Sequence, residues 1–367
     1  MGADFPWGDQ NVMRRFDMEL PYHGAIIHTI ASRSGHPVLP GHPDLHMTGY
    51  DKHSEQPPLP FHSQFAVPFF IGLTIHSTAI VFVQKSVFRL DGASGAQRIR
   101  AIYRIWSNVR NLPLDKCEVG PPAGSRSKRT RVWFATGRGA RVCLLWLVQQ
   151  ATSSTMASIF RRLKVTVDVF GPVHQGLVPS ISTMGVCGIM SFHWIWTSYY
   201  SLTTANDLAA ILFVAILGWD AAEEWPPLFG SLADAYTLRR FWGVFWHRLH
   251  VYSFTLCMPS LHFSRNTLVG GAFGSFWVFT LSAWSHAVAN SILYGQHFLM
   301  SELRFFLLNW AVCSVETIAG RTLVARKTFG RGVVAKGLGY GWVFTVFFCI
   351  VPAWQYPKLH HYVERYS

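Results

Sequence analysis

The sequence predicts an all-α membrane protein, a multi-pass transmembrane helical bundle of about seven spans, some of them re-entrant, around a buried cavity. Half of the 367 residues are hydrophobic and only 14% are charged, which is too apolar for an ordinary soluble domain. The apolar residues gather into long uncharged runs. The basic residues, which bring the formal net charge to +13, lie between these runs.

The first 62 residues differ from the rest of the chain. They are polar, contain seven histidines and cluster proline with glycine, so we expect a disordered arm over residues 1–62 and one membrane domain over residues 63–367. The spacing of His36, His42, His46 and His53 matches no metal-ligand pattern, and the six cysteines form no CxxC pair. We therefore expect no metal site.

The apolar runs suggest where the chain crosses the bilayer. Phe65–Gln84 is long enough for a first span, and residues 85–141 follow as a loop with thirteen basic residues against three acidic ones, which predicts a cytosolic position. Several later runs are short or separated by one polar residue, which favours broken or re-entrant helices. All the later apolar runs are Val142–Phe160, Leu177–Thr203, Leu208–Trp219, Thr267–Ser285, Ala287–Ser301, Phe305–Gly320 and Leu338–Trp354.

The placement of the charge limits the partners. The basic residues follow no aromatic-interleaved pattern typical of RNA binding, so we expect contacts with membrane lipids and acidic ligands and no nucleic acid. No internal repeat and no obligate protein partner is evident.

One polar and aromatic stretch begins at Trp225-Pro-Pro-Leu-Phe-Gly-Ser. The two prolines break a helix, and Ser231 is placed to cap a new one that we expect from about Leu232. On such a helix one face would carry four residues spaced by three or four positions: Arg240, Gly243, His247 and His250. A purely structural alternative is an interfacial helix that Trp242 and Trp246 anchor to lipid headgroups.

A second stretch places Ser282, His286 and Asn290 four residues apart on an otherwise apolar helix. Ionisable residues in such surroundings usually face a cavity or a partner. A neutral imidazole at His286 suits two roles: a structural hydrogen bond between helices, or a base that accepts a proton from an alcohol.

These two stretches together resemble the wax synthase-like branch of the membrane-bound O-acyltransferase superfamily. Trp225-Pro-Pro-Leu-Phe-Gly-Ser, then Phe241-Trp-Gly-Val-Phe-Trp-His247, then Phe279-x-x-Ser282-x-x-x-His286 are similar to that family's motifs in order and separation. Ala283 departs from the glycine that usually follows the serine. The resemblance covers roughly residues 225–290, and the branch includes plant wax ester synthases and fungal acetyltransferases of terpenoid metabolites.

The resemblance implies an acyl-CoA-dependent O-acyltransferase of the endoplasmic reticulum membrane, with a catalytic cavity inside the bundle. His286 would be the catalytic histidine and His247 would occupy the second catalytic position. Acetyl-CoA or another acyl-CoA would be the co-substrate, a lipophilic alcohol would be the acceptor, and no bound cofactor is implied. The expected substrate-binding residues are Arg239 and Arg240, for the CoA phosphates, with Trp242, Trp246, Ser282 and Asn290.

Three other functions compete with this one. A long-chain wax ester synthase differs only in its acyl chain and acceptor. A multi-pass transporter would suit polar groups in mid-membrane, but Glu316 is the only acid within these runs and no half is repeated. A membrane terpene cyclase or hydroxylase would need an acidic cluster or a multi-histidine pattern, and neither is present.

Overall fold

The computed structural model describes residues 94–106, 128–175, 177, 183–259, 267–296, 298–320 and 332–366. Within these ranges the regular structure is helical, without strands, which confirms the all-α prediction for this part of the chain. The predicted arm over residues 1–62 and the predicted span Phe65–Gln84 lie outside the described residues.

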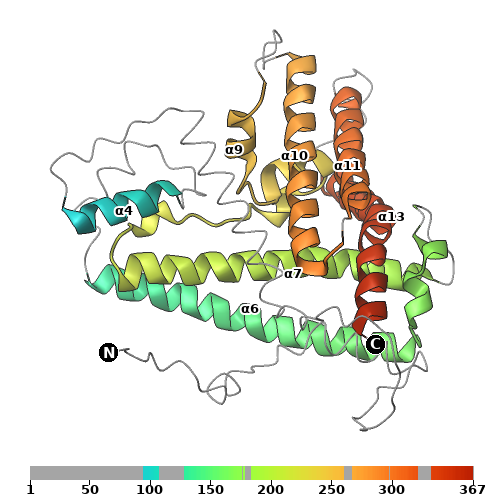
Figure 1. Cartoon of the computed structure of the whole chain (residues 1–367), viewed down its shortest axis with the longest axis horizontal. Coiled ribbons are helices and arrows are strands. Elements are labelled where there is room, and N and C mark those ends of the chain that lie inside the picture. The colour runs from blue at the N-terminus through green and yellow to red at the C-terminus, as the bar shows by residue number, and fades with distance from the viewer. Residues whose placement is uncertain are drawn as a thin grey trace, which may run out of the picture.

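Five long helices form the frame of the part of the chain that the structure describes. α6 (Lys128–Arg162) and α7 (Met184–Ala210) run side by side, and Figure 1 shows α10 (Leu268–Tyr294) and α11 (Leu299–Ala319) paired and steeply inclined to them. α13 (Val333–Tyr366) contacts both α7 and α11. The shorter α-helices are α4 (Gly95–Trp106), α8 (Leu238–Arg240) and α9 (Val251–Leu256). The remaining elements are the 3₁₀ turns η2 (Val167–Phe170), η3 (Pro172–His174), η6 (Ala222–Glu224) and η7 (Leu232–Asp234), and the π-helices η5 (Ile211–Ile216) and η8 (Phe241–Phe245).

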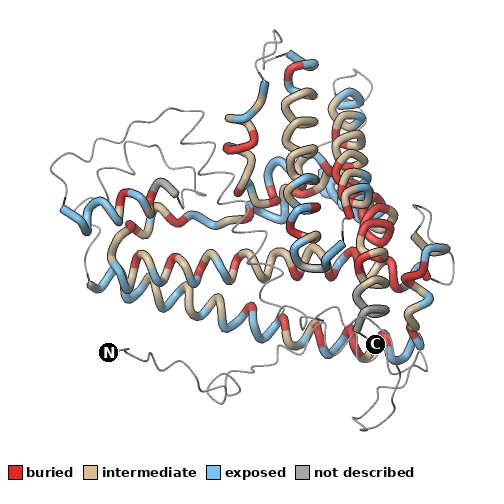
Figure 2. The backbone as a smooth tube through the Cα atoms, viewed as in Figure 1, coloured by how far each residue is buried: buried red, intermediate tan, exposed pale blue. Residues whose placement is uncertain are grey.

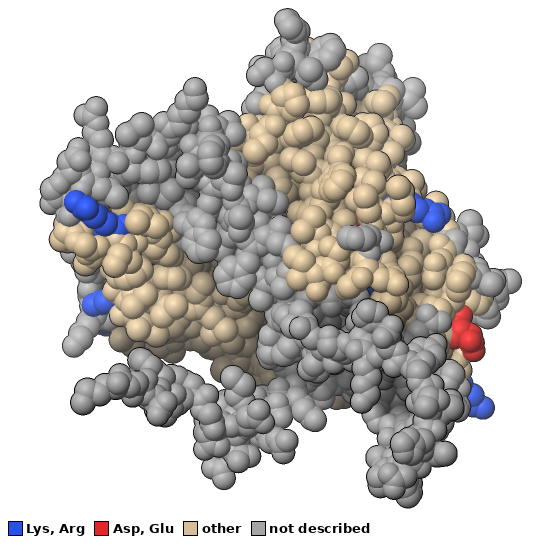
Figure 3. Space-filling view, in the orientation of Figure 1, with Lys and Arg blue, Asp and Glu red and all other residues tan. Residues whose placement is uncertain are grey.

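Within the described part of the chain, two helical stretches are long and apolar enough to cross a bilayer, Met184–Ile216 and Val333–His361. The described surface over α10 and α11 also shows almost no charged side chain in Figure 3. Such a surface is suited to contact with lipid. The expectation of about seven spans remains a prediction.

The helix boundaries differ from the predicted runs in three places. Residues 85–141, predicted as a loop, contain α4 and the beginning of α6. The runs Leu177–Thr203 and Leu208–Trp219 are not separate, since α7 continues directly into η5. The acid that divides them, Asp207, is fully buried and bound by two arginines of α6, so the helix need not break to keep this charge in water. α10 likewise passes through His286 without interruption.

The single helix expected from about Leu232 is wrong. The chain instead forms η7, α8 and η8 in succession, and Trp246 is extended, with φ −68° and ψ 150°. An α-helix that continued here would need the carbonyl of Phe245 as an acceptor for a later N–H. That carbonyl already accepts the N–H of Gly230 at 2.8 Å. His247 and His250 therefore do not extend a helical face begun by Arg240 and Gly243.

The largest core forms around this broken segment. Phe241, Phe245 and Trp246 pack with residues of α10, α11 and α13, among them Phe305 and Phe347. Figure 2 shows buried positions gathered where α11 and α13 meet, whereas much of α6 is exposed. The motif segment, residues 225–247, thus lies at the centre of the packing. It does not lie on the surface as an interfacial helix would.

Candidate active site

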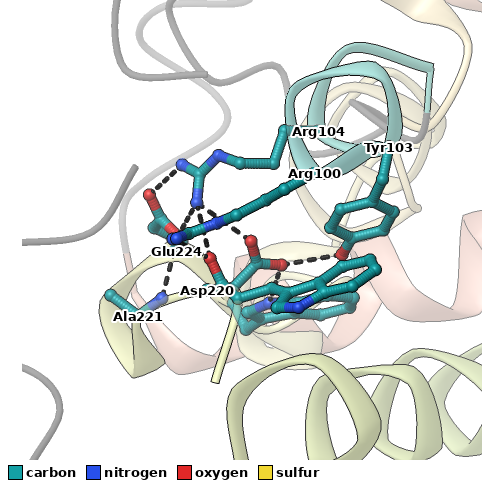
Figure 4. A network of polar contacts seen from close by, with 8 residues as sticks. Arg100, Tyr103, Arg104, Asp220, Ala221 and Glu224 are labelled. Carbon is teal, nitrogen blue, oxygen red and sulfur yellow. Dashed lines mark hydrogen bonds and ion pairs between the residues drawn. The ribbon is translucent and has the colours of Figure 1, made fainter. Parts of the chain in front are cut away.

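Two ion-pair networks hold the start of the motif segment. In the first, α4 buries Arg104 completely against Asp220 and Glu224, at 3.0 and 2.5 Å. Tyr103 donates to the same Asp220 at 2.7 Å, and Figure 4 shows these side chains converging on the turn before Trp225. Buried charges are tolerated when they are paired and hydrogen-bonded in this way.

The second network comes from α6. Arg138 and Arg141 both bind Asp207, and Arg138 also donates to the carbonyl of Trp225. The indole N–H of Trp225 in turn donates to Asp220 at 3.1 Å. Trp225 therefore joins the two networks, which places the following Pro-Pro turn at a defined position between α4, α6 and α7.

Gly230 allows the motif segment to fold back on itself. Its N–H donates to the carbonyl of Phe245, and a Cβ at this position would overlap the carbonyl of Val244. Ser231, as predicted, caps the turn that follows, because its hydroxyl accepts the N–H of Ala233 at 3.2 Å. The glycine of the motif is thus explained by close approach of two backbones.

The beginning of α8 is held by a carboxylate from another helix. Glu316 of α11 accepts the N–H groups of Leu238 and Arg239, both at 2.8 Å, while Thr237 accepts the N–H of Arg240 at 3.1 Å. A negative charge at free N–H groups of a helix start is favourable. The acid that seemed misplaced in an apolar run therefore orients the motif segment.

His247 follows η8 and is half-buried between aromatic rings. Its ring centre lies 5.6 Å from that of Phe229 and 5.4 Å from that of Trp246. Its Nδ1 is buried and has no hydrogen-bond partner among the described residues. The surrounding protein lowers the pKa of His247 to about 3, mainly by removing water from the charged ring, with repulsion from His250 and His286 adding to it. His247 is therefore a neutral imidazole at physiological pH.

His286 lies near the middle of α10, and its side chain is exposed although the helix is apolar. Its ring centre lies 5.2 Å from that of Phe306. A charge on this ring would interact with His247, with Glu302 and with Lys358. The structure thus brings the two predicted catalytic histidines, which are 39 positions apart in the chain, within electrostatic reach of each other and leaves His286 accessible.

The four predicted binding residues around η8 are placed differently from one another. Arg240 is engaged by Asp234, with its guanidinium donating to the carbonyl at 2.8 Å and to the carboxylate at 2.5 Å. The side chain of Arg239 is exposed. Trp242 is half-buried and donates to Asn309 at 3.0 Å, whereas Trp246 is buried in the core.

Ser282 and Asn290, the other predicted binding residues, lie one turn to either side of His286 on α10. The hydroxyl of Ser282 donates to the carbonyl of Val278 at 2.8 Å, which satisfies the serine within its own helix. Asn290 donates across to Glu302 of α11 at 2.6 Å.

Some residues near the site escaped the sequence reasoning. Glu302 and Lys358 form a buried ion pair beside His286, and Asn309 binds the indole of Trp242. The signal for Glu302 and Asn309 was present, because each is a polar residue within or beside an apolar run. Their partners lie on other helices, so their spacing along the chain does not reveal them.

The motif region also matches a known family. A model of the membrane bound O-acyl transferase family matches residues 225–308, from Trp225 through His286 into α11. Acetyltransferase ataH of Aspergillus terreus is 31% identical to this chain over 265 residues, which cover 69% of this chain and 75% of that protein. Acetyltransferase atnC of an Arthrinium species is 31% identical, over 71% of this chain and 60% of its own length.

Other relatives match over a shorter region. Acetyltransferase eriL of Hericium erinaceus is 29% identical over 45% of this chain and 43% of its own length, so the chain spans less than half the length of this relative. No solved structure matches the chain. The family match falls on the motifs that carry the sequence resemblance, and one relative is aligned over three quarters of its length. The predicted resemblance is thereby confirmed, and the chain belongs to the membrane-bound O-acyltransferase family.

Proposed function

We propose that this protein transfers an acetyl group from acetyl-CoA to a hydroxyl group of a terpenoid or meroterpenoid secondary metabolite. The observation that carries the proposal is that the family's motif region contains both an accessible His286 and a neutral His247. Relatives matched over about 70% of this chain are named acetyltransferases, which favours acetyl as the acyl group.

In the proposed reaction His286 is the general base. It accepts the proton of the bound alcohol as the alcohol oxygen attacks the thioester carbonyl. A carbon–oxygen bond forms, the carbon–sulfur bond breaks, and the proton on His286 passes to the departing thiolate of CoA. These reaction steps need no acyl-enzyme intermediate, no metal ion and no bound cofactor.

His247 and Arg239 have supporting roles in this proposal. As a neutral imidazole, His247 orients the acceptor or polarises the carbonyl through a ring nitrogen. Arg239, whose side chain is exposed, is the better placed of the two arginines to meet the CoA phosphates, because Arg240 already binds Asp234. Trp246 packs beside the His247 ring, and Trp242 packs against Trp246.

A multi-pass position in the endoplasmic reticulum membrane, with about seven spans, completes the proposal. The two candidate spans and the membrane-bound family support it. A transporter is not favoured, since family membership accounts for the polar residues of α10. A wax ester synthase remains the second candidate because it would use the same motif residues with a longer acyl chain.

The direct test is transfer of labelled acetyl from acetyl-CoA by microsomes that contain the protein, with a panel of terpenoid and fatty alcohols as acceptors. We expect a labelled ester of a terpenoid alcohol with the wild-type protein. The His286→Ala variant should form none while reaching the wild-type level in the membrane. Labelled product from the variant would contradict the role of His286. A preference for long acyl-CoAs and fatty alcohols would favour the wax ester synthase.

A further inference from the structure

A buried ion pair lies beside His286 and has no part in the reaction described so far. Glu302, in the first turn of α11, is fully buried, and Lys358 of α13 is 6% exposed. The ammonium of Lys358 lies 2.5 Å from Oε1 of Glu302 and 4.0 Å from the ring centre of Trp354. A buried pair of this kind is weak support for stability, because desolvation offsets most of the attraction.

Only one of the two oxygens of the Glu302 carboxylate has partners among the described residues. Asn290 donates to the same Oε1 that Lys358 contacts, at 2.6 Å. The other carboxylate oxygen, Oε2, is buried and has no hydrogen-bond partner among the described residues. An unsatisfied carboxylate oxygen is costly, so its retention points to a use for the negative charge.

Geometry connects the pair to His286. Asn290 lies four residues after His286, so both project from one face of α10, and Asn290 holds the carboxylate of Glu302 at that face. A positive charge on the His286 ring would be attracted by Glu302 and repelled more weakly by Lys358. His247 would also repel it, from the segment after η8. Among the described residues these three are the charged or titratable groups that act on His286.

We propose that Glu302 is a positioning residue for His286: its carboxylate, fixed by Lys358 and Asn290, stabilises the imidazolium that forms while the alcohol is deprotonated. The inference rests on the proposed function and extends it. The proton moves from the alcohol to His286 and then to the thiolate. Lys358 holds the carboxylate in place and balances its charge, so that the resting site is neutral.

The test compares the pH dependence of kcat in Glu302→Gln and Lys358→Met. Loss of the negative charge should destabilise the imidazolium, which moves the acidic limb of the profile to lower pH by about one unit and lowers kcat about tenfold. Lys358→Met leaves Glu302 unbalanced and should move the limb to higher pH. The Michaelis constants should change little. Glu223→Gln, an isosteric change at an exposed acid, is the matched control and should match the wild type.

A second readout does not depend on turnover. Diethyl pyrocarbonate modifies only the neutral form of histidine, so its site-resolved rate at the exposed His286 reports protonation directly. The pH at which this modification rate is half-maximal should move to lower pH in Glu302→Gln and to higher pH in Lys358→Met. Equal midpoints in all variants, with folded protein, would overturn the inference and leave a purely structural ion pair, whereas absence of any ester from the wild type would instead overturn the proposed function. If Glu302→Gln fails to fold, the double variant with Lys358→Met removes both charges. Because Glu302 acts on the ring more strongly than Lys358, the midpoint of this double variant should lie below that of the wild type, and kcat should fall. A wild-type midpoint together with a wild-type kcat would then contradict the inference.

Discussion

At the scale of single residues, the two histidines of the site have different surroundings. His247 is half-buried between Phe229 and Trp246, with an unpartnered Nδ1, whereas His286 is exposed on α10. A histidine that resists protonation is suited to orient a substrate, and one that remains accessible is suited to exchange a proton with it. The division of roles proposed here follows from these environments.

The lowered pKa of His247 predicts how stability depends on pH. Below its ordinary pKa of 6.5 the unfolded chain takes up a proton at this ring, while the folded protein resists until about pH 3. Acidification from pH 7 to pH 5 should therefore destabilise the protein through this residue, by about 2 kcal/mol at pH 5.

Thermal unfolding in detergent at pH 7 and pH 5 measures this effect. His247→Asn should lose less melting temperature on acidification than the wild type, since asparagine does not titrate. An equal loss in both proteins would show that His247 is not the group responsible.

Gly230 predicts a sharp dependence on side-chain size. The methyl group of Gly230→Ala would overlap the carbonyl of Val244 and break the hydrogen bond from the Gly230 N–H to the Phe245 carbonyl. We therefore expect the free energy of unfolding to fall by about 2 kcal/mol or more. Gly243→Ala is the matched control in the same segment, because no atom lies within 4 Å of its added Cβ. Melting temperatures of the two variants should separate clearly, and equal values would contradict the close approach.

At the scale of elements, short pieces replace the regular helix that the spacing suggested. α8 and η8 together span only residues 238–245, too few to be stable without tertiary contacts. Glu316 supplies hydrogen bonds at the start, Gly230 closes the end, and aromatic packing covers the sides. The element therefore exists because its neighbours hold it.

The docking of α4 gives a prediction at this scale. Arg104→Met would leave the buried Asp220 and the half-buried Glu224 without their common partner, which should cost about 3–5 kcal/mol. Because Asp220 also binds Trp225, the motif segment should loosen and acyl transfer should fall. Arg162→Met, at the exposed end of α6, is the control and should leave the melting temperature unchanged. The prediction fails if both variants melt alike.

At the scale of the whole molecule, three of the long helices pack against the motif segment. α10 contributes His286, α11 contributes Glu302 and Glu316, and α13 contributes Lys358. Packing between apolar helices pairs Glu302 with Lys358 and places Glu316 at the start of α8.

Membrane crossing by the stretch Met184–Ile216 is open to a direct test. Cysteines placed at Met184 and Leu217, both exposed, in a background without other cysteines, should lie on opposite sides of the membrane. A membrane-impermeant maleimide should label only one of them in sealed vesicles and both after permeabilisation. Labelling of both in sealed vesicles would show that this stretch does not cross.

The sequence by itself determined the helical class, the apolar runs and the identity of the motif residues. Composition and uncharged runs suffice for the first two because a bilayer constrains any helix that crosses it. The motifs carry the family membership, since they are short and local in the chain.

Only the tertiary structure decided how the site is assembled. Spacing along the chain predicted a continuous helix with His247 on one face, but a hydrogen bond from Gly230 ends that helix first. The spacing likewise could not distinguish Arg239 from Arg240, whereas in the structure Arg240 forms an ion pair with Asp234. The contact of Glu302 with Lys358 joins two residues 56 positions apart on different helices. No local pattern encodes such a pairing, because it depends on how the helices pack.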